Sequence, residues 1–178
     1  MKILALVLLF CFVSSKTKRQ IVIEHAKDKI DSTDWEYESQ TTSGKDRTSE
    51  NGKVFFCAYE PKCNLFVYEM LDLAGIEIEL INKMGMMCRA FHWSEPGERP
   101  PTVKDWYDEI VEGMELVGKG SDGVWKSMPG DIIVEYNENT HHMGIISRTQ
   151  RTISACADQI CETDFGWSSS TVKVFRYE

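Results

Sequence analysis

Positive charge is scarce in this chain. Its 178 residues include 28 acidic and 20 basic side chains, which gives a formal net charge of −8 at pH 7. The sequence contains no stripe of lysine and arginine with interleaved aromatic residues, the usual sign of nucleic-acid binding. We therefore expect no nucleic-acid partner.

Long apolar runs are also scarce. The run from Ile3 to Val13 is too short to cross a bilayer as a helix, and no other long run follows it. Lys2 precedes this run, and Val13 and Ser15 are small enough for the −3 and −1 positions of a cleavage site. Residues 1–15 are therefore typical of a secretory signal peptide, with a membrane anchor as the alternative. We expect a secreted, extracellular protein without membrane contact after cleavage.

The chain has no internal repeat. Removal of the signal peptide leaves 163 residues with a charge of −9, which is the size of a single domain with one core. Residues 16–53 are mostly polar, and those from 27 onward are expected to form irregular surface or a covering arm. Residues 54–178 are expected to form the main domain.

An odd number of cysteines remains after signal cleavage, because Cys11 leaves with the peptide. Export favours disulfides, so two bridges and one free thiol are expected. If Cys63 is the free residue, the other four allow three pairings, and we favour the sequence-adjacent Cys156 with Cys161. That leaves Cys57 with Cys88. The alternative is that Cys63 is bridged and another cysteine is free or intermolecular.

The residues after Cys63 have helical spacing. Apolar positions recur at i, i+3 and i+4, and Gly75 occupies the position where glycine commonly ends a helix. The start of a helix carries partial positive charge and free N–H groups, which favour a thiolate and can hold an oxyanion. Cys63 is therefore the candidate nucleophile.

Helical patterns come first in the chain, and strand patterns follow. Thr102 and Asp105 predict a capping box that opens a second amphipathic helix, with one face formed by Trp106, Ile110, Val111 and Met114. Four strands are then expected, over residues 131–136, 142–147, 152–156 and 171–177. This order predicts an α+β fold in one domain.

His142 is the candidate general base for the Cys63 thiol. Strand alternation places it on one face with Gly144, whereas its neighbour His141 is expected to point away as a surface residue. The pair of histidines has no accompanying cluster of metal-ligand type, so neither a metal nor another cofactor is expected.

Three segments together resemble the NlpC-type papain-like cell-wall amidases. Residues 62–67, leading into a helix that ends at Ala74-Gly75, are similar to the family's nucleophile helix. Residues 129–134 resemble the Pro-Gly-Asp strand before the catalytic histidine, and residues 142–146 resemble the His-x-Gly-Ile strand. Cysteine before histidine excludes the circularly permuted acyltransferase branch. The resemblance implies a papain-like fold with N-terminal helices packed on an antiparallel sheet.

The family usually carries a third polar residue on the next strand, which orients the imidazole. Aligning His142 with the family's histidine places Ser154 at this third position. Asp158 in the following turn is the alternative, because a carboxylate would better stabilise the imidazolium.

The cysteine segment is most similar to amidase effectors that bacteria inject through type VI secretion. The signal peptide and extra cysteines match their animal relatives, the domesticated amidase effectors acquired by horizontal gene transfer. The resemblance implies an antibacterial hydrolase of innate immunity that cuts amide bonds beside D-glutamate or meso-diaminopimelate in bacterial peptidoglycan. Two alternatives remain: a disulfide-stabilised binding protein that is a catalytically inactive relative, or a secreted cysteine protease or acyl transferase.

Overall fold

The computed structural model describes residues 15–36, 44–119, 124–167 and 170–178. The expected signal peptide, apart from Ser15, lies outside this part of the chain, as does Cys11. No helix among the described residues combines the length and hydropathy needed to cross a membrane. These helices are α1 (Lys18–Asp28), α2 (Cys63–Leu73), α3 (Met86–Phe91) and α4 (Val103–Tyr107).

One antiparallel sheet of six strands forms the centre of the molecule, in the order β5-β10-β6-β7-β8-β9. Its strands are β5 (Met114–Leu116), β6 (Ile132–Tyr136), β7 (His141–Arg148), β8 (Arg151–Ala155), β9 (Ile160–Thr163) and β10 (Val172–Tyr177). Two small antiparallel pairs lie outside it: β1 (Arg47–Thr48) with β2 (Phe55–Phe56), and β3 (Asn82–Lys83) with β4 (Glu98–Arg99). Helices and antiparallel sheets in one chain agree with the predicted α+β class.

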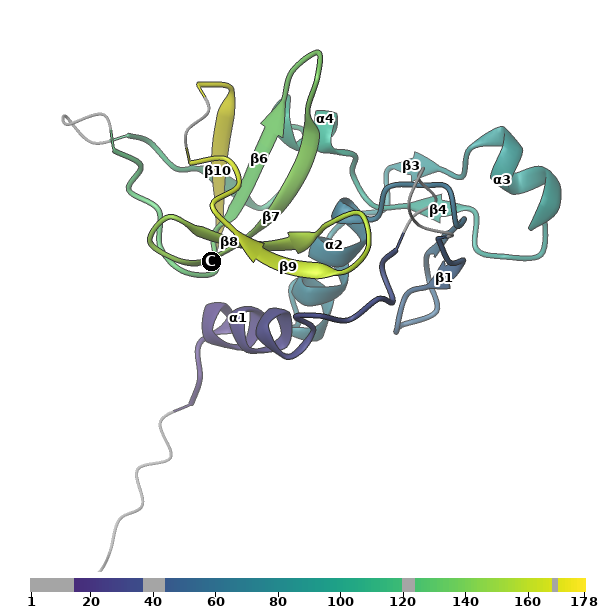
Figure 1. Ribbon diagram of the computed structural model, residues 1–178, viewed down its shortest axis with the longest axis horizontal. Helices are drawn as coiled ribbons and strands as arrows, with labels where there is room; N and C mark the ends of the chain where they lie inside the picture. The colour runs from purple at the N-terminus through teal and green to yellow at the C-terminus, as the bar shows by residue number, and fades with distance from the viewer. Residues whose placement is uncertain (1–14, 37–43, 120–123, 168–169) are drawn as a thin grey trace, which may run out of the picture.

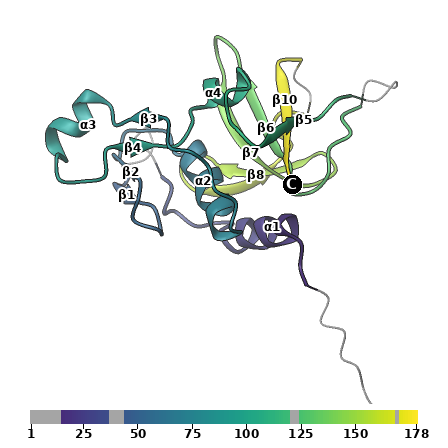
Figure 2. The ribbon, with the colours of Figure 1, turned by 180° about the vertical axis from the view of Figure 1, so that it is seen from behind.

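The two faces of the six-stranded sheet are covered differently. Helices α1 and α2 lie against one face, as Figures 1 and 2 show from opposite sides. Here the main core forms around Leu65, Phe66 and Met70 of α2 together with Met143 and Ile145 of β7. A smaller apolar cluster occupies the other face, where it is covered by loop side chains: Trp125, Phe165 and Trp167.

Helix α2 begins and ends where the sequence predicts. Its C-terminus is a Schellman motif: the N–H of Gly75 donates to the carbonyl of Asp72, and that of Ile76 donates to Leu71, both at 2.9 Å. Gly75 has a φ of +70°, a conformation that costs glycine little. Eight of the eleven residues of α2 are buried, so this helix is the centre of the core.

The second predicted helix is much shorter than expected. The capping box of Thr102 and Asp105 is present, but α4 ends at Tyr107. The chain then turns through Glu109 at φ 63° and Gly113 at φ 75°. Ile110 consequently lies exposed, and Met114 belongs to strand β5 instead of a helical face. The four predicted strands are confirmed. Helix α3 and the strands β1, β3, β4, β5 and β9 were not predicted.

The N-terminal polar segment contributes to the core as well as to the surface. A capping box between Thr17 and Gln20 opens α1, and this helix buries Val22 and Ala26 against α2. Further along, Trp35 is completely buried and packs edge-on against Phe66 at 5.4 Å between ring centroids. The covering-arm interpretation is therefore incomplete.

A buried ionic network fixes this segment to α2. The indole N–H of Trp35 donates to a carboxylate oxygen of Glu69 at 2.7 Å, and Arg47 pairs with the same carboxylate at 2.9 Å. The backbone N–H of Glu50 also donates to Glu69, at 2.9 Å. The Arg47 guanidinium lies 4.0 Å above the Trp35 ring. Both oxygens of the buried Glu69 carboxylate therefore accept hydrogen bonds.

Replacement of Glu69 by alanine should destabilise the fold strongly. The change leaves Arg47 and Trp35 without their acceptor in a buried site, so we expect a loss of about 3–5 kcal/mol in the free energy of unfolding. Urea unfolding followed by tryptophan fluorescence measures this loss. Glu79→Ala, at an exposed position, is the matched control and should change stability by less than about 0.5 kcal/mol. Equal effects of the two substitutions would contradict the role of the network.

Candidate active site

Cys63 is the free thiol among the five described cysteines. Cys57 pairs with Cys88, and Cys156 pairs with Cys161, which confirms the predicted pairing. Cys63 is the first residue of α2 and is only 4% exposed. The structure thus leaves one unbridged sulfur, and it lies at the start of the central helix.

The loop before Cys63 is held by the side chain of Lys62. This lysine is 1% exposed, and its ammonium donates to the carbonyls of Glu36 at 2.7 Å, Cys57 at 3.2 Å, and Ala58 and Glu60 at 3.3 Å. Burial lowers the pKa of Lys62 to about 8. Because one ammonium binds these four carbonyls, it restricts the conformation of residues 57–62, the loop that leads to Cys63.

Strand β7 brings the backbone of Met143 to the Cys63 sulfur. The hairpin between β6 and β7 closes with the N–H of Asn137 donating to Thr140, and Met143 lies opposite Val134. The alternation of antiparallel pairs then points the Met143 N–H away from β6. That N–H is directed at the Cys63 sulfur, where it lowers the thiol pKa. The nucleophile therefore lies beside the residue that follows His142.

His142 and Ser154 are brought together as predicted. The ring Nε2 lies 3.1 Å from the Ser154 hydroxyl, which is fully buried on β8. Phe165 packs edge-on against the imidazole at 4.6 Å between centroids. Asp158, the alternative partner, is exposed in the turn between β8 and β9. The structure thus favours Ser154 over Asp158 as the residue that orients His142.

Glu135 is a charged neighbour of His142 that the sequence analysis missed. It lies directly opposite His142 in the β6–β7 pairing, and its carboxylate favours the protonated imidazole. Its Oε1 accepts hydrogen bonds from Asn137 at 3.1 Å and from Thr171 at 3.4 Å. The turn at residues 137–139 was recognised from the sequence, and counting back from it across the hairpin would have paired Glu135 with His142.

The resting protonation state differs from the thiolate expected at a helix start. Burial raises the pKa of the Cys63 thiol to about 11, which outweighs the lowering effect of the N–H groups of Met143, Asn64 and Cys63. Burial also lowers the pKa of His142 to about 4, although Glu135 opposes this. At neutral pH the site therefore holds a neutral thiol and a neutral imidazole.

A cleft of about 390 Å³ opens at Cys63. Its walls come from the nucleophile loop, the start of α4 and the β6–β7 hairpin: Glu60, Asn64, Lys104, Tyr136 and His141. His141 is exposed, as predicted, but it stacks on Tyr136 at 4.5 Å between centroids and faces this cleft. The cross-strand pairing of Tyr136 with His141 positions both rings.

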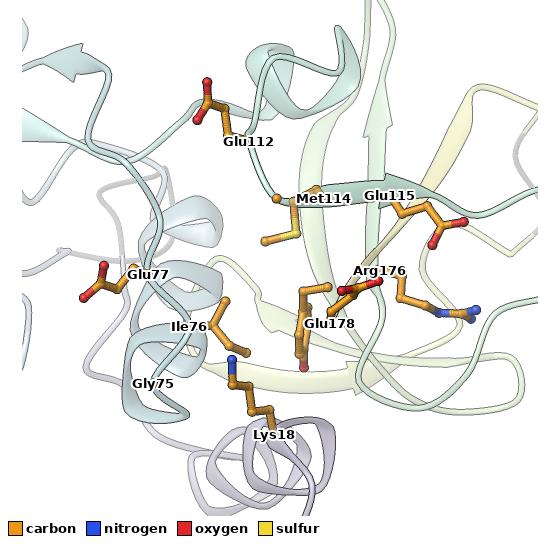
Figure 3. A pocket seen from close by; sticks show the side chains of 11 residues that line it. Lys18, Gly75, Ile76, Glu77, Glu112, Met114, Glu115, Arg176 and Glu178 are labelled. Carbon is orange, nitrogen blue, oxygen red and sulfur yellow. The ribbon is translucent and has the colours of Figure 1, made fainter.

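A wider hollow of about 740 Å³ lies between α1, the end of α2, β5 and β10 (Figure 3). Three of its carboxylates, those of Glu77, Glu112 and Glu115, point away from one another, and the fourth, Glu178, lies on the side of Arg176. Arg176 is already paired with Asp131 at 2.7 Å. This hollow therefore lacks the arrangement of an acid–base or metal site.

Potential metal ligands cluster around one disulfide. Cys57 lies near Asp46 and His92 on one side and near Glu60 and Cys88 on the other. Because Cys57 and Cys88 are bonded to each other, their sulfurs are not thiolate ligands in this state. The described residues around Cys63 and His142 form no such cluster.

Comparison with protein-family models and with curated proteins gave no match for this chain.

The reactivity of Cys63 toward iodoacetamide should rise steeply with pH. Because the raised pKa keeps the thiol protonated, alkylation of the native protein should be slow at about pH 7 and should increase toward about pH 11. Mass spectrometry of time points across the pH range measures the rate. Cys63→Ser is the control and should remain unlabelled, since the other described cysteines are bridged. A rate that is already constant between about pH 5 and 8 would indicate a thiolate–imidazolium pair and contradict this prediction.

Proposed function

We propose that this protein is a secreted cysteine amidase that hydrolyses peptide amide bonds in bacterial peptidoglycan. The observation that carries the proposal is the free Cys63 thiol at the start of α2, whose sulfur lies beside the backbone N–H of Met143, the residue that follows His142. A helix that starts with cysteine and packs on a histidine-bearing strand is the arrangement expected of an NlpC-type papain-like fold. Two of the three sequence segments that resemble this family, residues 62–67 and 142–146, meet where the Cys63 sulfur lies beside the Met143 N–H.

Two features support export. The two disulfides fit an oxidising compartment, where thiols of this kind persist as bridges. The apolar run at residues 3–13 fits a signal peptide. Secretion would place the enzyme where it can meet bacterial wall outside the cell.

The proposed reaction starts from the neutral pair. In the tautomer that donates Nε2–H to the Ser154 hydroxyl, Nδ1 is the nitrogen left to accept the thiol proton as the sulfur attacks the amide carbonyl. The N–H groups near the sulfur, those of Cys63, Asn64 and Met143, are candidates to hold the oxyanion. The imidazolium then gives its proton to the leaving amine, which leaves a thioester on Cys63.

Water completes the proposed cycle. His142 takes a proton from water, the hydroxide attacks the thioester carbonyl, and the sulfur leaves and regains its proton from the imidazolium. Ser154 brings no charge, but Glu135 across the hairpin supplies a carboxylate that favours the imidazolium. In this proposal the Glu135 carboxylate on β6 stabilises the imidazolium, as a charged residue in the position of Ser154 would do.

A binding protein without activity is the second candidate. The observation in its favour is that burial holds Cys63 and His142 in their neutral forms. Protease or acyl-transferase activity would use the same residues on another substrate, and cleavage of a casein substrate that Cys63→Ala abolishes would reveal the protease.

Cys63→Ala should abolish release of peptide fragments from purified peptidoglycan, resolved by mass spectrometry. His142→Gln should lower kcat by about a thousandfold or more, because the proton acceptor is lost. His141→Gln is the matched control: it removes a ring from the cleft wall and should change KM more than kcat.

Absence of cleavage by the unaltered protein, on walls of several chemical types, would reject the amidase; retained binding to those walls would then favour the binding protein. Retained activity in His142→Gln with loss in His141→Gln would exchange the roles of the two histidines.

Ser154→Ala should lower kcat by about five- to tenfold, which is the loss expected for one hydrogen bond that orients the base. Asp158→Ala, in the exposed turn, should stay within about twofold of the unaltered enzyme. Thermal unfolding of both variants separates lost orientation from lost stability. A larger activity loss in Asp158→Ala would restore the carboxylate as the orienting residue.

A further inference from the structure

A second cavity lies on the face of the sheet opposite α2. It has a volume of about 400 Å³, which is within the range of roughly 300–1,000 Å³ for small-ligand pockets. Ile146 of β7 lines it from the sheet, and the rings of Trp125 and Trp167 line it from two loops. We call it the indole cavity.

The lining of the indole cavity suits an uncharged ligand that is both apolar and hydroxylated. The described lining residues include no carboxylate, although the chain as a whole is strongly acidic. The single cation among them, Lys119, lies 4.7 Å from the centroid of the Trp125 ring. Hydroxyl and amide groups come from Ser127, Thr149 and Gln150.

A sugar ring matches this combination. A pyranose presents C–H groups on one face, which the negative face of an indole attracts, and hydroxyls around its edge. Those hydroxyls need hydrogen-bonding partners when they leave water, and side chains such as Ser127 and Gln150 offer both donors and acceptors. An acetamido group adds a planar amide that Gln150 can pair with.

Gln150 occupies a position where glycine would be less strained. It has a φ of +56° in the two-residue turn between β7 and β8, a region that most side chains avoid. The turn therefore carries an amide side chain at the edge of the indole cavity despite a local conformational cost.

Strand β7 links the indole cavity to the proposed active site. His142 and Ile146 lie four residues apart on the same face of β7, roughly 13 Å along the strand. The loop after β9 spans this distance: Phe165 packs on the His142 ring, and Trp167 lines the cavity. A polymer bound in the cavity is thus held near the strand that carries the candidate base.

We infer that the indole cavity binds a sugar of the N-acetylhexosamine class and retains the protein on the glycan strand of its substrate. The identity of the polymer as peptidoglycan rests on the proposed function, whereas the sugar site itself does not. The sugar contributes no reacting group, so the site acts on binding and not on the chemical step.

Calorimetric titration with chitotetraose, a β-1,4-linked tetramer of N-acetylglucosamine, tests the site directly. This probe has no stem peptide, so binding is measured independently of amide cleavage. The unaltered protein should bind it, and Trp125→Ala should weaken binding by about tenfold or more, because one of the two rings is lost. Trp93→Ala, at an exposed tryptophan beside α3, is the matched control and should bind normally.

A second variant, Gln150→Gly, tests sugar binding in the indole cavity if Trp125→Ala does not fold. Glycine accepts the positive φ, so the turn should be at least as stable, while the amide is lost. We expect weaker binding of chitotetraose by about threefold to tenfold. With intact peptidoglycan as substrate, both variants should raise KM. With a free stem peptide, which has no sugar, both variants should have the same kcat as the unaltered protein.

No binding of chitotetraose by the unaltered protein overturns the inference, even if the amidase activity is confirmed. Binding of an apolar probe such as anilinonaphthalene sulfonate that the sugar does not displace would assign the cavity to apolar ligands and also overturn it. Sugar binding without any amide cleavage would support the indole cavity and reject the proposed function.

Discussion

The packing of α2 against β7 is the contact on which the rest of this structure depends. Eight of the eleven residues of α2 are buried, and the core of the sheet's helical face forms around them. The same contact sets the position of Cys63, since the helix begins with this residue and its sulfur meets the N–H of Met143. Hydrophobic burial of one helix therefore serves the fold and the candidate site together.

Buried charges fix the segments that the hydrophobic core does not reach. Glu69 joins the N-terminal segment to α2 through Trp35 and Arg47, and Lys62 gathers four carbonyls of the chain before Cys63. Such groups are costly to bury unless their hydrogen bonds are complete, so each one restricts the chain to a narrow set of conformations. The Cys57–Cys88 bridge adds a covalent tie for the projecting α3 region (Figure 1).

Burial also sets the electrostatics of the candidate site. It moves the pKa of Cys63 up and that of His142 down, so that neither group is charged at rest. In the proposed reaction, such a site would transfer its proton during attack instead of storing a thiolate, with nearby dipoles and Glu135 stabilising the charges that develop. The low intrinsic reactivity of a protonated thiol is compatible with the oxidising conditions under which the two disulfides persist.

The sequence by itself determined most of the local elements and favoured the cysteine pairing that the structure shows. Helical spacing and Gly75 defined α2, and alternation defined β6, β7, β8 and β10. The odd cysteine count predicted one free thiol, and the helix start after it favoured Cys63 as that thiol. These features depend on neighbours in the chain, so their physical causes are visible in the order of residues. The predicted second helix was too long, because its apolar periodicity continues past Glu109. In the structure the backbone has a positive φ at Glu109, and the helix has ended at Tyr107.

Tertiary structure alone decided which groups surround Cys63 and His142 and what their environment does to them. The meeting of Cys63 with Met143, the choice of Ser154 over Asp158 and the cleft position of His141 all depend on how distant segments pack. The protonation state of the thiol was also decided there: a helix start favours the anion, but desolvation by the surrounding core outweighs it. Burial is a property of the assembled fold, and for that reason the order of residues could not reveal it.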